Sequence, residues 1–335
     1  MGTIGECVTL VDWAKQVDPD GKPARLINLM EKYNPIIEDA PVMEGNLSTG
    51  HQTTAIIKLP TSTWRKFNYG VQDSKGSTIQ VVDSIGMLEQ YAKVDVDVAN
   101  LNGNSNEFML RQSKMHIAAM NNDFCTTLFY GDTDQYPERF LGLSQRYLDI
   151  VTDEGSNNVM GAGGSASAGS GDLSSIWLVG WGDDTAHLVY PKGHSSVGLQ
   201  IDDLGVQLVT DGAGGFYQAR VIHYKWDVGL VVANWKYVVR IGNIETAIPK
   251  TGATSNGLTA VNLLIWARNQ IPNLSACKPV FYCSGKVKTQ FDIMAANKTN
   301  AFYTAKDPFG KPVTMFMDIP VKKCDAILDT EEQLS

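Results

Sequence analysis

The sequence predicts an α+β fold assembled from an N-terminal arm, a long β-hairpin, one long helix, a strand-rich region and a smaller helical region. Three observations support this prediction. The stretch Ser105–Tyr130 contains neither glycine nor proline, although the chain holds 31 glycines and 13 prolines, and Gly103 and Gly131 border it. The residues before this stretch read as extended β-structure, and β-prone runs separated by turn residues follow it. A long hairpin that leads into one long helix suits a wide, flat subunit that is tied to its neighbours.

The composition indicates a folded chain with surface to hide in contacts. Of the 335 residues, 43% are hydrophobic and only 19% are charged, which is a low charged fraction for a globular protein. The net charge of −8 argues against a dedicated nucleic-acid-binding face, though not against a protein that encloses nucleic acid without gripping it. Five scattered cysteines do not form a disulfide pattern and favour a reducing compartment. We expect no signal peptide and no membrane span.

Residues 1–47 read as an arm. Two short amphipathic helices are predicted, at Val8–Gln16 and Ala24–Lys32. The segment Asn34–Pro41 then carries two prolines with Ile36 and Ile37 between them, so we expect extended backbone there rather than a helix. An apolar extended segment needs a partner surface, either on its own domain or on a neighbouring subunit.

Residues 48–100 read as a long hairpin and its stem strands. The β-prone runs are Thr53–Leu59, which Pro60 stops, and Ser77–Val82. The tip between them carries three aromatic residues and two cations: Trp64, Arg65, Lys66, Phe67 and Tyr69. Because such residues are enriched in protein interfaces, we predict that they contact another subunit, together with Ile36 and Ile37. The alternative is that Trp64 packs on its own subunit.

Residues 93 to 140 should contain a strand and then the long helix. Lys93–Val98 alternates strictly between valine and charged residues, which predicts a half-buried strand. Asn104 is a natural N-cap for the helix, and Glu107 and Arg111 have the spacing of a helical ion pair. The helix should turn one apolar stripe to a core, made of Ile117, Met120, Phe124 and Leu128.

The second half of the chain is predicted to hold most of the remaining strands. A flexible glycine-rich loop spans residues 161–171. Two hairpins are expected, Ile176–Trp181 with Ala186–Tyr190 and Phe216–Trp226 with Leu230–Ile241. Two helices are expected around one short strand, Leu258–Asn269 and Lys286–Asn297 around Val280–Cys283. Closing strands are expected near Val313–Met317 and Val321–Ile327.

No motif proposes catalysis or a bound metal. The glycine-rich loop lacks the Gly-Lys-Ser/Thr ending of a phosphate-binding loop, and Gly193–Gly198 departs from the spacing of a hydrolase nucleophile elbow. The remaining candidates have simpler explanations as turn residues, as a solvated strand face or as cysteines with the wrong spacing for zinc, and they are Asp183, Asp184 and His187, Asp95 and Asp97, and Cys277 and Cys283. We therefore expect no catalytic residue, no cofactor and no metal.

Short motifs along the whole chain carry a family resemblance. They are Asp12–Lys15, Asp18–Gly21, Glu44–Asn46, Leu59-Pro60, Trp64-Arg65, Asn68–Val71, Val94-Asp95, Ile319–Val321 and Cys324-Asp325. In these motifs and in its order of parts, the chain resembles the major capsid proteins of tailed phages with the Hong Kong 97-type fold. It is most similar to the capsid subunits of short-tailed phages of the epsilon15 and Bordetella-phage kind. No single motif is specific, and the resemblance rests on their shared order.

The resemblance implies a domain organisation. Gln52–Ser84 would be the extended loop that reaches over a neighbouring subunit, and residues 101–140 would hold the spine helix of the peripheral domain. Residues 141–245 would be a strand-rich peripheral region, residues 246–312 an axial domain at the centre of hexamers and pentamers, and residues 313–335 the closing strands. The strand-rich block precedes the two axial helices, whereas the commoner order ends with the peripheral strands, which points to a permuted connectivity.

The resemblance also implies the function. The chain would self-assemble through quasi-equivalent pentamers and hexamers into an icosahedral shell that encloses double-stranded DNA without sequence-specific binding. Its partners would be other copies of itself, a portal protein, and a scaffolding or cement (decoration) protein. It would act in the virion after assembly in the host bacterial cytoplasm. Lys58, Lys66 and Lys75 match no crosslinking site of the family, so we expect non-covalent assembly.

A function of another class stays open on the residues alone. A β-rich carbohydrate-active hydrolase or a carbohydrate-binding receptor module would use exposed aromatic residues and carboxylates. The aromatic candidates are Trp177, Trp181, Tyr190, Tyr217, Trp226 and Trp235, which are more simply explained as core residues of hairpins. The long helix and the reaching arm favour the shell subunit, because a sugar-cleaving domain needs neither.

Overall fold

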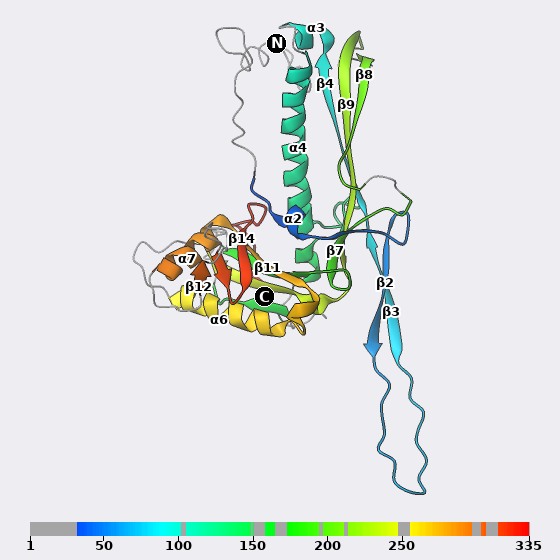
Figure 1. The fold of residues 1–335 in the computed structure, drawn as a ribbon, viewed down its shortest axis with the longest axis vertical. Coiled ribbons are helices and arrows are strands. Elements are labelled where there is room, and N and C mark those ends of the chain that lie inside the picture. Colours follow the sequence, from blue (N-terminus) through cyan, green and yellow to red (C-terminus); the bar gives the residue numbers. More distant parts are fainter. Residues whose placement is uncertain are drawn as a thin grey trace.

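The computed structural model describes residues 32–101, 105–148, 150, 158–164, 173–193, 197–210, 214–246, 255–296, 303–305 and 314–334. The predicted helix at Val8–Gln16, nearly all of Ala24–Lys32, the Asn104 cap and most of the glycine-rich loop lie outside these residues. The molecule is elongated (Figure 1), with helix α4 (Ser105–Tyr130) along its long axis. A hairpin of β2 (Gly50–Lys58) and β3 (Ser77–Ser84) projects at one end, and an α/β lobe lies beside the axis.

Helix α4 has the predicted bounds, and its sequence explains both its length and its end. Arg111 and Glu107 form the expected ion pair at 3.0 Å. The helix stops at Gly131, where a β-carbon would lie 2.3 Å from the carbonyl oxygen of Phe140, so only glycine fits. Met120, Phe124 and Leu128 are buried as predicted, and Ile117 is half-buried.

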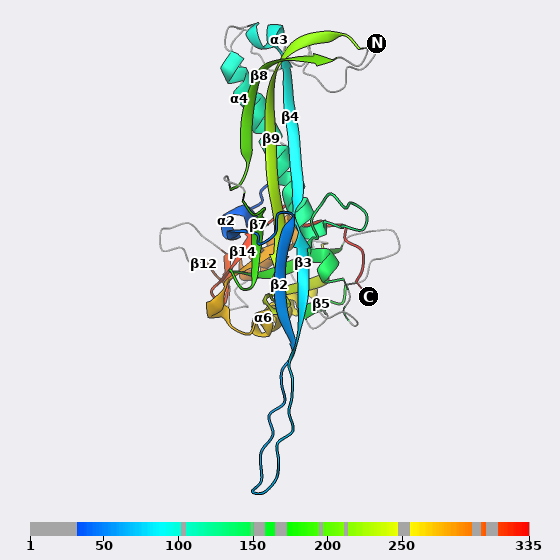
Figure 2. The same cartoon turned by 90° about the vertical axis from the view of Figure 1, so that its right-hand side faces the viewer.

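One face of α4 lies against a long antiparallel ribbon. The ribbon consists of β4 (Gly86–Asp95), β9 (Phe216–Val232) and β8 (Gln200–Thr210), with β9 in the middle. Figure 2 shows these strands running along the helix. Met109 and Met120 of the helix share a core with Ala92 and Val94 of β4 and with Tyr224 of β9. Burial of this apolar stripe holds the helix to the ribbon.

Among the described residues, twelve strands form one hydrogen-bonded sheet whose main order is β12-β13-β14-β11-β6-β7-β9-β4. β1 also pairs with β7, β8 with β9, and β10 with both β5 and β6. The bounds not yet given are β1 Val42–Glu44, β5 Val159–Gly161, β6 Leu173–Trp181, β7 Ala186–Tyr190, β10 Val238–Glu245, β11 Lys278–Cys283, β12 Tyr303–Ala305, β13 Thr314–Phe316 and β14 Ile319–Lys323. Strand β9 therefore belongs to both the ribbon and the lobe.

Two long helices cover the lobe sheet. They are α6 (Ser255–Gln270) and α7 (Gly285–Ala296), close to the predicted bounds. Leu264 and Ala267 of α6 and Phe291 of α7 are fully buried against the sheet. The short helices are α2 (Ile36–Asp39), α3 (Val96–Asn100), α5 (Leu143–Arg146), η2 (Trp235–Tyr237) and η3 (Leu274–Ala276).

Two predicted elements of the first hundred residues are corrected by the structure. Ile36–Asp39 forms one helical turn, because Pro35 occupies the N-cap position, where its missing N–H costs nothing. The strand predicted over Lys93–Val98 ends at Asp95, whose carboxylate accepts a hydrogen bond from the Asp97 amide at 2.8 Å and so starts α3. Asp95 is therefore the N-cap of α3 and ends the strand, whereas Pro35 only precedes its helical turn and makes no capping hydrogen bond.

Both predicted hairpins of the second half are also wrong. Strand β9 runs uninterrupted through Asp227-Val228-Gly229, which had the composition of a turn. β6 and β7 are not hairpin partners, since they share only one parallel residue pair, Trp181 with Ala186. In addition, β6 pairs with both β10 and β11 in one sheet.

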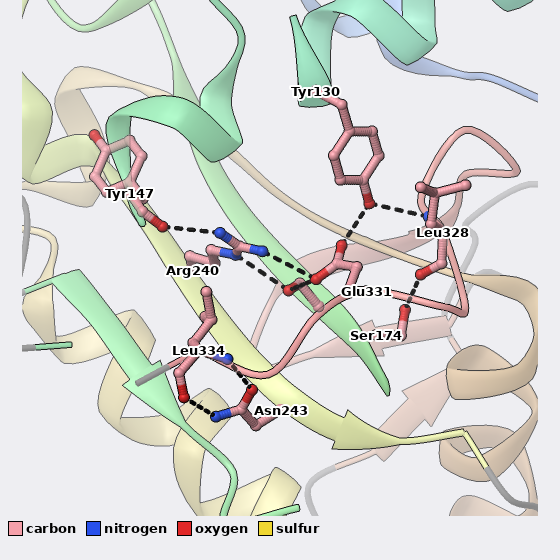
Figure 3. A network of polar contacts seen from close by, with 9 residues as sticks. Tyr130, Tyr147, Ser174, Arg240, Asn243, Leu328, Glu331 and Leu334 are labelled. Carbon is pink, nitrogen blue, oxygen red and sulfur yellow. Dashed lines mark hydrogen bonds and ion pairs between the residues drawn. The ribbon is translucent and has the colours of Figure 1, made fainter. Parts of the chain in front are cut away.

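A buried polar network joins α4 to the lobe through the C-terminal segment (Figure 3). The Glu331 carboxylate accepts hydrogen bonds from Tyr130 of α4 and Ser175 of β6, and pairs with Arg240 of β10 at 3.0 Å. Burial and the adjacent carboxylate raise the pKa of Tyr130, so its hydroxyl stays protonated and donates. Farther along, the Asn243 amide exchanges two hydrogen bonds with the Leu334 backbone, at 2.8 and 2.9 Å.

Candidate interaction surfaces

The β2–β3 hairpin is the most exposed part of the described chain. Its strands pair from Gly50 opposite Ser84 to Lys58 opposite Ser77. Beyond them the loop Leu59–Gly76 closes on itself, with the Ser74 hydroxyl donating to the Thr61 carbonyl at 2.8 Å. Asn68 turns the chain at the tip with φ of +64°, a conformation that asparagine tolerates better than most residues.

The aromatic residues at the tip have no contact that buries them. Trp64 is 101% exposed, Phe67 97% and Tyr69 70%, so Trp64 does not pack on its own subunit. Further apolar side chains along the hairpin are exposed as well: Ile56, Ile57, Leu59, Val71, Ile79, Val81 and Val82. A two-stranded hairpin is marginal in water by itself, and a continuous apolar surface of this kind marks an interaction site.

The tip also differs in charge from the rest of the chain. The loop Leu59–Gly76 holds the cations Arg65, Lys66 and Lys75 and the single carboxylate Asp73, a net charge of +2 in a chain of net charge −8. Opposite potentials steer association and select partners. An apolar, basic projection from an acidic subunit is therefore suited to an acidic partner surface.

The root of the hairpin makes specific polar contacts with the body. Arg146 of α5 pairs with the buried Asp83 of β3 at 2.7 Å. The Asn46 side chain exchanges two hydrogen bonds of 2.7 Å with the backbone of Gln52. A β-carbon on Gly50 would lie 2.4 Å from the Asp83 carbonyl oxygen, so the two strands meet closely here. The tip is thus presented by an anchored base.

The two isoleucines predicted to contact another subunit have different environments. Ile36 is fully buried in the core of its own subunit, with Phe124 and Trp181 in the same cluster. Its side chain packs in this core and has no exposed surface that a neighbouring subunit could contact. Ile37 is 38% exposed on the outer side of the same helical turn. The structure therefore separates Ile36 from the exposed candidates and keeps Ile37 among them.

A second apolar surface, which sequence reasoning missed, lies on β8 and the start of β9 in the ribbon. Ile201, Val206 and Leu208 of β8 and Phe216 of β9 are each more than half exposed. The signal in the sequence was the alternation of Val206 and Leu208, but Asp202, Asp203 and Gly205 lower the strand propensity of that segment. β8 pairs with β9 alone, so its other edge is open among the described residues.

The residues that sequence reasoning weighed for chemistry do not converge. Asp183 and Asp184 are exposed in a turn, while His187 is buried in β7. Burial raises the pKa of Cys283 to about 12, so this thiol is not a nucleophile at neutral pH. Within the described parts of the chain, no three His, Cys, Asp or Glu side chains gather as a metal site. None of the described helices is long and apolar enough to cross a membrane.

Comparison with known proteins identifies similar chains. The family model described as major capsid protein GP7 matches residues 18–335. A solved structure of bacteriophage epsilon15 is 30% identical, with a TM-score of 0.72 over 100% of this chain and 99% of that one. The bacteriophage JBD30 capsid is 11% identical over 89% of this chain and 93% of that one, with a TM-score of 0.49. No curated protein matches.

Proposed function

Since the chain belongs to the major capsid protein GP7 family and is a subunit of a phage capsid shell with the Hong Kong 97-like fold, we propose that the β2–β3 hairpin is the element by which neighbouring subunits hold one another. The family's role is structural rather than enzymatic. The alternative of a carbohydrate-active hydrolase or carbohydrate-binding module has no support in the comparisons. The subunit assembles with other copies of itself into the shell.

The exposure of the hairpin carries this proposal. A subunit that keeps Trp64 and Phe67 entirely in water gives up the apolar burial that these rings offer, roughly 2 kcal/mol for each ring. A neighbouring subunit that covers them recovers this free energy. We assign the contact to Trp64, Arg65, Lys66, Phe67 and Tyr69, with Ile37 as a separate exposed contact.

Quasi-equivalent packing into pentamers and hexamers explains why the contact is on a projection. One sequence must make similar contacts at different angles, and a projection on a narrow root can change its angle while it keeps its local contacts. Each contact can be weak, because many contacts per subunit give a stable closed shell.

The finer assignments rest on the same proposal. We place 1–47 as the arm, 48–100 as the extended loop, 101–140 as the spine segment, 141–245 as strand-rich, 246–312 as axial and 313–335 as closing strands. The acidic net charge fits a wall that encloses double-stranded DNA without binding it tightly. A portal protein and a scaffolding or cement protein are the further partners, and assembly occurs in the host bacterial cytoplasm before the subunit enters the virion.

The test removes the two tip rings. Trp64→Ala with Phe67→Ala should leave the thermal midpoint of the unassembled subunit within about 2 °C, because exposed substitutions change stability little. The same variant should form fewer shells in negative-stain images and a smaller mass in light scattering. Trp64→Phe, which retains an apolar ring, is the matched control and should assemble.

Normal assembly by the double variant would refute the role of the hairpin. It would leave the membership of the capsid family untouched, since that rests on the sequence and structural matches.

A further inference from the structure

Buried polar atoms without partners gather at the root of the hairpin. Within the described residues, no hydrogen bond of good geometry reaches His51 Nδ1, Thr53 Oγ1, Asp83 Oδ2, Arg146 Nε or either ring nitrogen of His187, which has only a weak backbone contact with Gly182. Buried polar groups are almost always paired, so such a concentration needs an explanation. These atoms come from β2, β3, α5 and β7, the elements that join the hairpin to the body.

Two histidines lie at the centre of this cluster. The rings of His51 and His187 meet edge to face, with centroids 5.7 Å apart. His187 is only 2% exposed, and its strand β7 pairs with β9 inside the sheet. His51 lies on β2 opposite Asp83 of β3. The pair therefore spans the boundary between hairpin and body.

The carboxylate opposite His51 already has a cationic partner. Asp83 pairs with Arg146 through Oδ1 at 2.7 Å, so a protonated His187 would have to share this carboxylate with the guanidinium. Other charged side chains near this end of β7 include Glu44 of β1, which accepts from the Gly193 amide, Asp183 in the exposed turn, and Asp227 with Lys225 on β9. Lys58 of β2 and Arg220 of β9 lie farther along their strands. Protonation of His187, which is 2% exposed, would thus place a positive charge in a buried site.

The backbone at this point is built like a joint. Only Ile85 separates β3, which belongs to the hairpin, from β4, which belongs to the body. A β-carbon on Gly229 would lie 2.8 Å from the Ser84 carbonyl oxygen, so β9 presses directly against the junction. A change in the packing beneath Ser84 and Ile85 would change the angle of everything beyond them.

We propose that the hairpin root is a proton-operated hinge, in which protonation of His187, whose ring meets that of His51, releases β2 and β3 from the body of the subunit. Burial, followed by the nearby His51, lowers the pKa of His187 below its ordinary value of 6.5, and the Gly182 carbonyl, Asp183 and Asp83 oppose this without outweighing it. The closed root thus favours the neutral ring, whereas an opened root binds protons more readily. The free energy that favours the closed root is therefore at its full value above pH 6.5, and it decreases as the pH falls below 6.5. The proposal holds whether or not the tip contacts a neighbour.

Hydrogen–deuterium exchange with mass spectrometry tests the hinge in the full-length chain. Between pH 7.5 and 5.5, the protection factors of β2 and β3 amides, corrected for intrinsic exchange, should fall by about tenfold, the factor that one histidine gives one pH unit below its ordinary pKa. Amides of β6 should keep their protection. Light scattering confirms that both samples have the same state of assembly.

His187→Phe should abolish the fall, because the ring can no longer take a proton. His116→Phe is the matched control. His116 is another histidine whose pKa is lowered by burial, but it lies on α4 stacked on Tyr224, so this variant should respond as the wild type does. If His187→Phe does not fold, His187→Gln, which is also neutral at both pH values, replaces it with the same expectation.

Three results would overturn the hinge. They are an unchanged wild-type hairpin at pH 5.5, a full response in the His187 variant, and a response that disappears in His116→Phe.

Discussion

At the scale of single residues, Asp39 shows how a charge fastens one segment to another. Its carboxylate lies at the end of α2, receives Lys278 at 2.8 Å and Lys322 at 2.7 Å, and accepts a hydrogen bond from the Tyr282 hydroxyl. Burial raises the pKa of this carboxyl, but the hydrogen bonds from Lys278, Lys322 and Tyr282 together outweigh burial and hold it below 3.8. The ionised form therefore ties α2 to β11 and β14.

Replacing Asp39 with Asn should destabilise the unassembled subunit by about 2 kcal/mol, since charge-assisted hydrogen bonds are lost at a buried position. Urea denaturation at pH 7 measures this difference. Because the folded pKa is lowered, the contribution is complete above pH 3.8 and shrinks as the pH falls below it. Asp292→Asn, in an exposed helical pair with Lys288, should change stability by less than about 0.5 kcal/mol. Equal effects of the two substitutions would contradict this account of Asp39.

At the scale of elements, helix α4 depends on one packed stripe more than on its local propensity. Phe124 is 1% exposed and lies against Trp226 of β9, with ring centroids 4.4 Å apart. Leu110 of the same helix is 58% exposed. The two residues separate the contribution of packing from that of helix formation.

Phe124→Ala should cost about 4 kcal/mol, the magnitude expected when a buried aromatic ring is truncated. Leu110→Ala should change stability by less than about 0.5 kcal/mol. Differential scanning calorimetry of unassembled subunits compares the two midpoints. A similar loss in both variants would show that helix propensity, rather than the stripe, dominates.

The elements that the sequence predicted well are those whose ends depend on local chemistry. The bounds of α4 followed from the absence of glycine and proline within it and from Gly131 after it. The errors arose where contacts with distant parts of the chain determine the conformation of a segment. Asp227-Val228-Gly229 has the composition of a turn, but Gly229 is needed because β9 packs closely against Ser84. β8 was missed because it contains two aspartates, which lower strand propensity but are tolerated once the strand pairs with β9. The exposed tip was predicted from composition, whereas the burial of Ile36 depends on the whole core.

At the scale of the whole molecule, the network around Glu331 makes the lobe and the long helix one unit. The carboxylate joins α4, β6 and β10 and is 5% exposed, and Arg240 beside it is 4% exposed. Glu331→Gln should lower the free energy of unfolding by about 3 kcal/mol, because Arg240 would remain buried without its counterion.

The neighbouring Glu332 is exposed, and Glu332→Gln should be neutral. Unfolding followed both by Trp fluorescence and by far-UV circular dichroism tests this prediction. A Glu331 variant as stable as Glu332→Gln would mean that the network does not couple the two parts.

The continuity of β3, β4 and β9 has a mechanical consequence. β3 passes through Ile85 into β4, ten residues of β4 pair with β9, and β9 continues into the lobe sheet beside β7. Tension applied along the hairpin would reach the lobe through the hydrogen bonds between β4 and β9, which lie perpendicular to the direction of pull. Such a ladder resists in shear, with its bonds strained together rather than opened one after another. A container under internal pressure would in this way spread the stress from every grip through the wall of each subunit.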